Sequence, residues 1–206
     1  YLLMEKQHNR GQDGAGLTSL KFDLEPGKRY IDRERSNSDS SIKDIFDAVN
    51  RSINQYGHRP ELAGDSAWAK ENIPFAGEIY LGHLRYGTFG NNSIDYVHPV
   101  MRDNNWKSRT LVLAGNFNMT NVDKLFNKLV SLGQHPRDYS DTVTVLEKIG
   151  HFLDEENQQV FRQYKNEGYS NMEISKLIAE NINIGKILQA ATKDFDGGYA
   201  IAGLIG

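Results

Sequence analysis

Four short polar segments carry the residue types that could bind or transform a small charged molecule. They are NRGQDGAG (9–16), GHLRYGT (82–88), GNFNMTN (115–121) and SDT (140–142), and each lies where we expect a strand or helix to begin or end. An arginine such as Arg85 can hold a carboxylate through two parallel hydrogen bonds, and asparagine and aspartate add directional donors and acceptors. The four segments are therefore candidates for a ligand site.

Each segment also has a purely structural explanation. The glycines of 9–16 could supply positive φ where a helix gives way to a strand. Arg85 could pair with a surface acid, and the asparagines of 115–121 could be turn or cap residues. Asp141 could be a first-turn acid that the helix dipole favours. No segment decides between the two explanations on its own.

Helices and one hairpin are expected in the first part of the chain. YLLMEKQH (1–8) is typical of the last two turns of a helix, and the alternation from Leu20 to Leu24 before Glu25-Pro26-Gly27 predicts a hairpin with a second strand near Tyr30. Apolar residues then recur at helical spacing behind a possible capping pair: Ser41 and Asp44 as the pair, and Ile42, Ile45, Phe46, Val49 and Ile53 as the apolar face. The polar stretch 57–74 is expected to be a surface excursion.

Buried strands and further helices are expected in the second part. The short apolar runs 78–86 and 110–114 predict strands, and Thr120 or Asn121 could cap a helix that Gly133 closes. Another helix is indicated by the apolar spacing of Val145, Leu146, Ile149 and Phe152. A third is expected after an S-x-x-E capping box at Ser170 and Glu173, and a fourth over 184–191. The apolar run GGYAIAGLIG at the end of the chain predicts a strand.

Composition places the chain among ordinary globular proteins. With 38% hydrophobic and 25% charged residues it can bury a core, and 206 residues suit one domain. The net charge of −3 gives no electrostatic reason to expect nucleic acid, and no apolar run approaches the length of a membrane span. We expect a cytoplasmic protein with no nucleic-acid or membrane partner. The six histidines suggest no metal site, and the spacing of His83 and His98 is uninformative.

Together and in this order, the four segments resemble the glutaminase domain of the glutamine phosphoribosylpyrophosphate amidotransferases, which are class II amidotransferases of the N-terminal-nucleophile hydrolase type. NRGQDGAG is similar to the family's H-R-G-Q-[DE]-x-A-G, GHLRYGT to G-H-x-R-Y-x-T, GNFNMTN to H-N-G-N-L-T-N, and SDT to S-D-T. The sugar-phosphate aminotransferases have R-G-Y-D-S-A-G instead, so Gln12 and Tyr86 favour the purine enzyme. Residues 33–75 and 155–190 carry no motif of the family.

The resemblance implies a role for each matched residue. Arg85 would hold the α-carboxylate of glutamine, Asp141 its α-ammonium group, and Thr88 would lie near both. Arg10 and Gly11 would belong to the same substrate site. The Asn116 side chain and the Phe117 N–H would form the oxyanion hole that stabilises the tetrahedral intermediate.

Three positions depart from the family pattern. Phe117 stands where the family has glycine, and a phenylalanine would be strained if that position needed backbone angles reserved for glycine. Asn9 and Gly115 replace histidines of the family. The oxyanion hole is the part of the resemblance that these departures affect most.

The nucleophile of the family is an N-terminal cysteine whose own α-amino group, with a pKa near ~8, acts as the base. This chain contains no cysteine. We expect the chain to be truncated at both ends, with the first strand and its cysteine ahead of Tyr1, and these residues alone to be inactive.

The resemblance implies a four-layer α/β/β/α sandwich, an α+β fold, over 1–206. It implies glutamine as substrate, no cofactor or metal in this domain, a phosphoribosyltransferase domain after Gly206 with its own Mg²⁺ site, and a homo-oligomer. The activity would be hydrolysis of glutamine to glutamate and ammonia for phosphoribosylamine synthesis, the first step of purine biosynthesis. Two alternatives stay open: the glutaminase domain of a different class II amidotransferase, and a non-catalytic module that binds glutamine or supports an assembly.

Overall fold

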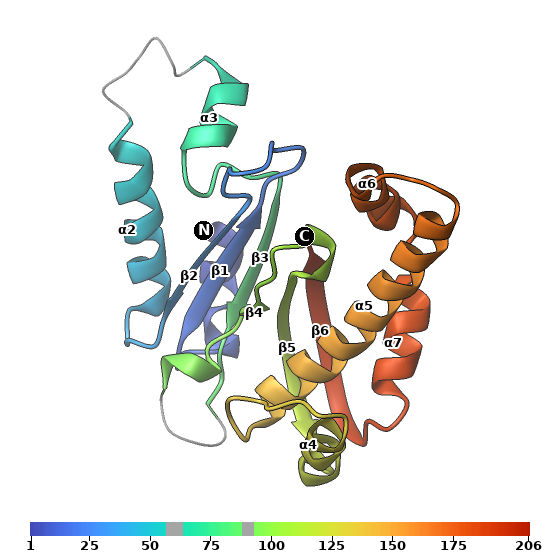
Figure 1. Ribbon diagram of the computed structural model, residues 1–206. Coiled ribbons are helices and arrows are strands. Elements are labelled where there is room, and N and C mark those ends of the chain that lie inside the picture. The colour runs from blue at the N-terminus through green and yellow to red at the C-terminus, as the bar shows by residue number, and fades with distance from the viewer. Residues whose placement is uncertain (57–63, 88–92) are drawn as a thin grey trace. The chain divides into compact units, whose positions relative to one another are not determined.

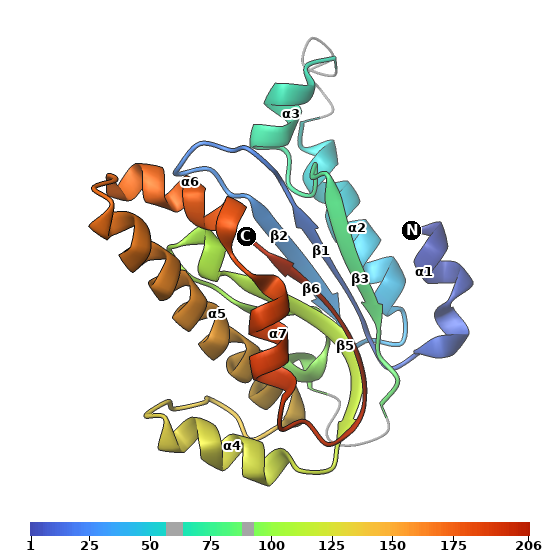
Figure 2. The same cartoon turned by 90° about the vertical axis from the view of Figure 1, so that its right-hand side faces the viewer.

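The computed structural model describes residues 1–56, 64–87 and 93–206. The chain divides into two compact units, Tyr1–Val100 and Met101–Gly206, each with helices beside a three-stranded sheet (Figures 1 and 2). The fold is thus α+β, as expected, and each unit is described by itself. Within the described residues, no helix is both long and apolar enough to cross a membrane.

The sheet of the first unit has the strand order β2-β1-β3, and both pairs are antiparallel. Ala15 pairs with Ser36 on one side and with Leu84 on the other. The elements of this unit are α1 (Leu2–Lys6), the 3-10 turn η1 (His8–Arg10), β1 (Ala15–Leu20), β2 (Ile31–Ser36), α2 (Ser41–Asn54), α3 (Ser66–Asn72), β3 (Ile79–Leu84) and the 3-10 turn η3 (Ile94–Tyr96).

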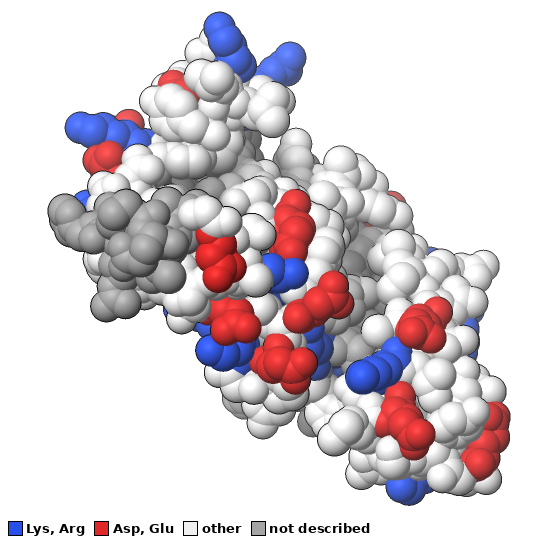
Figure 3. Space-filling model, turned by 90° about the horizontal axis from the view of Figure 1, so that it is seen from above, with Lys and Arg blue, Asp and Glu red and all other residues white. Residues whose placement is uncertain are grey.

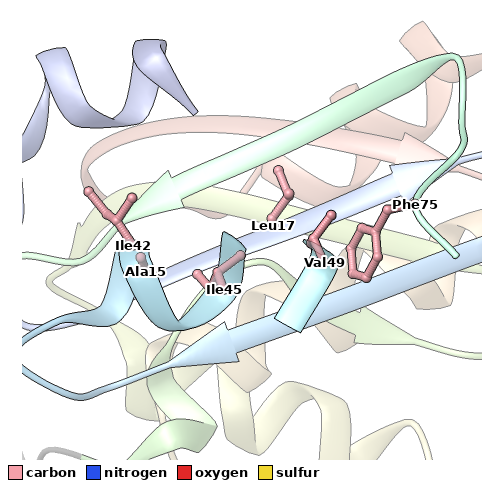
Figure 4. Close-up of a cluster of buried hydrophobic side chains, with 6 residues drawn as sticks. All are labelled: Ala15, Leu17, Ile42, Ile45, Val49 and Phe75. Carbon is pink, nitrogen blue, oxygen red and sulfur yellow. The ribbon is translucent and has the colours of Figure 1, made fainter. Parts of the chain in front are cut away.

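Helix α2 covers one face of this sheet because its apolar residues recur every three or four positions. Ile42, Ile45 and Val49 are buried against Ala15 and Leu17 of β1 (Figure 4). Phe75 completes the cluster from the connection between α3 and β3. The predicted apolar face of α2 is therefore confirmed for these three residues and for Phe46, which packs against the cluster, whereas Ile53 is 41% exposed.

A buried ion pair fixes the connection that carries Phe75. Lys21 Nζ lies 3.4 Å from Asp32 Oδ2 and donates to the Ile73 carbonyl at 2.8 Å. The same carboxylate accepts from the Phe75 N–H at 2.9 Å. These bonds hold Phe75 in the left-handed region at φ 61°, which a phenylalanine adopts only when its surroundings impose it.

The sheet of the second unit has the order β4-β5-β6, and β5 and β6 pair antiparallel from Leu111↔Ile205 to Met119↔Gly197. Helices α4, α6 and α7 each pack against α5, and α5 contacts β5 (Figure 2). The elements are β4 (Val100–Arg102), the 3-10 turn η4 (Lys107–Arg109), β5 (Leu111–Met119), α4 (Val122–Ser131), α5 (Asp141–Asn166), α6 (Asn171–Asn181), α7 (Ile184–Thr192) and β6 (Gly197–Ile205).

Helix ends show where local prediction succeeded and where it failed. The capping box of Ser170 and Glu173 is present, and Gly133 follows α4 with φ 82°. The pair of Ser41 and Asp44 is wrong, because Ser40 is the N-cap and Asp44 accepts the hydroxyls of Ser36 and Ser38. Asp44 is thereby used to order the turn before α2.

Helix α3 lies in the stretch expected to be a surface excursion. It begins behind Asp65, whose side chain accepts from the Trp68 N–H at 2.9 Å. Helix α3 has no buried residue, which fits the expected surface excursion for this part of 57–74, while residues 57–63 lie outside the described part of the chain.

Candidate functional site

The RGQDGAG segment runs beside the end of β3, where Arg85 follows Leu84. The Asp13 N–H donates to the Arg85 carbonyl at 3.0 Å, and the Arg85 N–H donates to the Gly14 carbonyl at 2.8 Å. Two motifs that are far apart in the sequence are therefore joined through the main chain of the arginine that the resemblance assigns to substrate binding.

Gly11 is needed for space rather than for its backbone conformation. Its φ of −172° is open to any residue, but a Cβ at this position would stand 2.6 Å from the Leu84 carbonyl carbon and 2.7 Å from the Arg85 oxygen. Gly16 is similar, because its Cβ would meet the His98 oxygen at 2.1 Å. Of the glycines in this segment, Gly14 has the positive φ that was expected, at 155°.

The Arg85 side chain is 8% exposed, and its guanidinium carbon lies 5.9 Å from the centre of the Tyr96 ring. This distance is within the range of a cation–π contact. Arg85 is therefore not an open surface residue, and its role as a ligand clamp stays a prediction. The neighbouring Tyr86 is 67% exposed, and Thr88 lies outside the described residues.

Arg10 is exposed at the end of η1 and lines a pocket of about 700 Å³ within the first unit. The walls of this pocket are mostly apolar and come from α1, α2 and the strands beneath them, including Met4, Phe46 and Leu84. His83 also lines it, and the ring centres of His83 and His98 are 4.8 Å apart. In residues 1–56, 64–87 and 93–206 we find no group of three or more His, Asp or Glu side chains arranged to hold a metal.

Asn116 and Phe117 lie in the second unit, inside the regular ladder of β5 and β6, opposite Ala200 and Tyr199. The Asn116 side chain is exposed. Among the described residues, Asp23 and Phe75 are the non-glycine residues with positive φ, so the Phe117 backbone carries no left-handed strain. Position 117 therefore does not need the backbone angles reserved for glycine.

Asp141 is the first residue of α5, directly after Ser140, whose hydroxyl accepts from the Val143 N–H at 3.2 Å. The Oδ1 atom of Asp141 accepts from the Thr142 N–H at 2.7 Å. A carboxylate here is favoured by the amino end of a 26-residue helix. The structural explanation as a first-turn acid is confirmed, and it is compatible with binding an ammonium group.

A polar network that the sequence analysis missed joins α4 and α5 to the segment before β6. The Asp194 carboxylate accepts a hydrogen bond from Lys128 and lies 3.4 Å from Lys148 Nζ. The backbone carbonyl of Asp194 accepts from the Asn121 side chain at 2.8 Å. The hydrogen bond from Lys128, with the charge of Lys148, lowers the pKa of Asp194 to about 2. Asn121 is the N-cap residue of α4, as one of the two expected candidates, but its side chain binds the segment before β6 instead of an N–H of the helix.

Lys148 is the buried member of this network, with 2% of its surface exposed. Its ammonium lies 5.3 Å from the centre of the Phe195 ring, and burial lowers its pKa despite the nearby Asp194. The sequence did hold a signal: Lys148 lies three residues after Val145 and four before Phe152, on the apolar face of the predicted helix.

Close packing completes the join between β5 and β6. Gly197 has φ 122°, and a Cβ there would lie 2.2 Å from the Asn118 oxygen. The Thr120 hydroxyl donates to the Asp196 carboxylate at 2.6 Å. The end of β5 that carries Asn116 is therefore fixed to the start of β6 by backbone contact and side-chain hydrogen bonds.

The candidate residues are thus held in two groups, each within one unit. Arg10, Gly11 and Arg85 belong to the first unit, and Asn116, Phe117 and Asp141 to the second. On the face shown in Figure 3, the basic side chains are scattered among acidic ones.

Comparison with known proteins gives a match in structure and none in sequence. No protein-family model matches the chain, and no curated protein matches it. The fold resembles a glutamine phosphoribosylpyrophosphate amidotransferase from B. subtilis, solved in complex with ADP and GMP, with a TM-score of 0.56 over all of this chain at 20% identity. It also resembles a structure described as the allosteric regulatory enzyme of purine biosynthesis, with a TM-score of 0.55 over 99% of the chain at 20% identity.

This similarity establishes a relationship of fold with the phosphoribosylpyrophosphate amidotransferases. The chain spans 31% of the length of each of the two matched structures. At this level of identity the likeness concerns the fold, and the site must be argued from the residues themselves.

Proposed function

We propose that this chain is the glutaminase half of an amidophosphoribosyltransferase, which hydrolyses glutamine to glutamate and ammonia for phosphoribosylamine synthesis. The observation that carries the proposal is the pairing of the RGQDGAG segment with the main chain on both sides of Arg85, within a fold related to the amidotransferases. The four motifs suggest the class of enzyme, and the likeness in fold to the amidotransferases is compatible with it.

Recognition of glutamine requires opposite charges for its two α-substituents. Arg85 supplies a cation that is largely withdrawn from water, where its bond to the substrate carboxylate is stronger than on an open surface. Asp141 supplies a carboxylate for the ammonium group, and Thr88 a hydroxyl nearby. Arg10 and Gly11 support the substrate segment, Gly11 through its close contact with the Leu84–Arg85 peptide.

The chemical step requires a nucleophile that these residues do not supply. A cysteine thiolate would attack the side-chain carbonyl of glutamine, and the resulting oxyanion would be held by the Asn116 amide and the Phe117 N–H. Collapse of this intermediate expels ammonia and leaves a thioester, and water then releases glutamate. The proposal therefore requires a mature protein that begins with cysteine, which N-terminal sequencing of the full-length protein tests.

The partner reaction would use the released ammonia. In the proposed enzyme a phosphoribosyltransferase domain, with Mg²⁺, combines that ammonia with phosphoribosylpyrophosphate, and the protein functions in the cytoplasm as a homo-oligomer. The four-layer sandwich belongs to the same proposal.

Substitution of Arg85 by alanine in the full-length protein tests the proposal. We expect glutamine-dependent synthesis to be lost and ammonia-dependent synthesis to be retained, because the guanidinium serves the glutaminase step alone. Arg51→Ala, at an exposed position of α2, is the matched control. If both activities fell together in Arg85→Ala, or if glutamine use survived, Arg85 would not have the proposed role.

A further inference from the structure

Asp13 has a side-chain contact that the proposed roles leave unexplained. Its Oδ2 accepts from the Gly87 N–H at 2.6 Å, across 74 positions of the sequence. Hydrogen bonds to a carboxylate are short and are stronger than those between neutral groups. Asp13 therefore holds the chain at a point two residues beyond Arg85.

Three hydrogen bonds join Asp13 and Gly14 to the main chain of residues 85–87, which contains the arginine. The Arg85 N–H donates to Gly14, its carbonyl accepts from the Asp13 N–H, and the Asp13 carboxylate then binds Gly87. Regular pairing of β3 ends at Leu84, so the carboxylate continues the attachment where strand hydrogen bonds have stopped. Residues 85–87 are thereby fixed at both ends.

The absence of a side chain at Gly87 leaves room for the Asp13 carboxylate. A Cβ at Gly87 would stand 3.3 Å from Asp13 Oδ2, closer than most such contacts, and 3.4 Å from the Asp13 Cβ, at the edge of ordinary van der Waals contact. A side chain at position 87 would therefore press on the carboxylate that binds its N–H. The contact can be weakened independently from either of its two residues.

We propose that Asp13 is a positioning residue for glutamine recognition: by binding the Gly87 N–H it fixes the main chain of residues 85–87 and so the direction of the Arg85 guanidinium. The inference rests on the proposed function for the identity of the ligand. Asp13 does not touch the substrate in this account and acts through Arg85, so its loss weakens glutamine binding and leaves the use of ammonia intact.

The test compares Asp13→Ala with Asp13→Asn in the full-length protein. For Asp13→Ala we expect the Kd and KM for glutamine to rise about tenfold, with kcat and ammonia-dependent activity within about twofold of the original protein. Asp13→Asn restores most of the affinity, because an amide oxygen can accept from the same N–H. Asp39→Ala, an exposed acid in the same unit, is expected to change nothing.

A second variant protects the test against misfolding. Gly87→Ala retains Asp13 and crowds the contact by one methyl group, and we expect it to raise the Kd for glutamine in the same direction. An unchanged Kd in both Asp13→Ala and Gly87→Ala would overturn the inference. So would a fall of glutamine- and ammonia-dependent activity in parallel, or an asparagine variant no better than alanine.

The failure of this inference can be told apart from that of the proposed function. If the unaltered protein released no glutamate, the proposed glutaminase would be rejected, and the Kd for glutamine would still report on Asp13. If the unaltered protein hydrolysed glutamine and Arg85→Ala abolished this, normal binding by Asp13→Ala would reject the positioning role alone. A protein that neither bound nor hydrolysed glutamine would reject both.

Discussion

Gly11 lies directly against Arg85, so that a Cβ on the glycine would stand 2.7 Å from the arginine's carbonyl oxygen. The contact is between main chains, and neither side can yield by a rotamer change. Replacement of Gly11 must therefore displace either the RGQDGAG segment or the end of β3. Such a replacement should therefore lower the stability of the fold and displace Arg85 in the candidate substrate site.

Gly11→Ala is expected to lower the free energy of unfolding by about 1–3 kcal/mol, the usual cost of forcing an extra methyl group into a packed site. The glutamine KM should rise with it, since Arg85 moves. Urea unfolding and steady-state kinetics measure the two effects. Gly198→Ala, where an added Cβ meets no atom of the described residues within 4 Å, should show neither effect. If the two variants had the same free energy of unfolding, the close contact between Gly11 and Arg85 would not be present.

Asn116→Ala is expected to lower kcat for glutamine hydrolysis by about 10²–10³ with a much smaller change in KM, because an oxyanion donor acts on the transition state. Asn118 is an exposed residue on the same face of β5, two positions further on. Asn118→Ala is thus the control and should keep its kcat. An unchanged kcat in Asn116→Ala would remove Asn116 from the oxyanion hole.

Lys148→Met should cost little stability, less than about 1 kcal/mol, because the thioether fills most of the space and Asp194 keeps Lys128 as a partner. Asp194→Asn should be clearly worse, since it leaves the buried Lys148 ammonium without its carboxylate. Chemical denaturation of the two variants gives the comparison. The reverse order would show that the apolar surroundings of Lys148, and not Asp194, determine the energy of this network.

The contribution of Asp194 to stability should depend on pH in acid. A carboxyl group with a depressed pKa stabilises the fold fully above its ordinary value of 3.8 and loses that contribution as the pH falls toward its folded value of about 2. The difference in unfolding free energy between the unaltered protein and Asp194→Asn should be constant from pH 7 to about 5 and should shrink between pH 4 and 2. Asp103→Asn, at an exposed position, is the control. A difference that stayed constant down to pH 2 would contradict the depressed pKa.

The sequence predicted features that depend on neighbours in the chain. Ser170 and Glu173 cap their helix because both partners lie within one turn, and the face of Ile42, Ile45 and Val49 follows from helical spacing. Asp44 failed as a capping residue because two nearby serine hydroxyls competed for its carboxylate. Local patterns do not resolve such competition.

Contacts between distant segments could not be predicted from patterns alone. The carboxylate of Asp13 reaches Gly87, and Lys148 meets Asp194 across 46 positions. The sequence left open whether position 117 needs the backbone angles of glycine, and its regular pairing with β6, without positive φ, shows that it does not. The order of the motifs in the sequence was enough to identify the candidate site residues. The groups that hold these residues in place could be identified only from the three-dimensional structure.

The most direct test of the proposed glutaminase is glutamate release from glutamine by the purified full-length protein, combined with mass analysis after treatment with an electrophilic glutamine analogue. We expect equal amounts of glutamate and ammonia, and a single analogue adduct on an N-terminal cysteine. Loss of both signals in Arg85→Ala would complete the result. A folded protein that binds glutamine but releases no glutamate and forms no adduct would contradict the account and would leave a glutamine-binding module in its place.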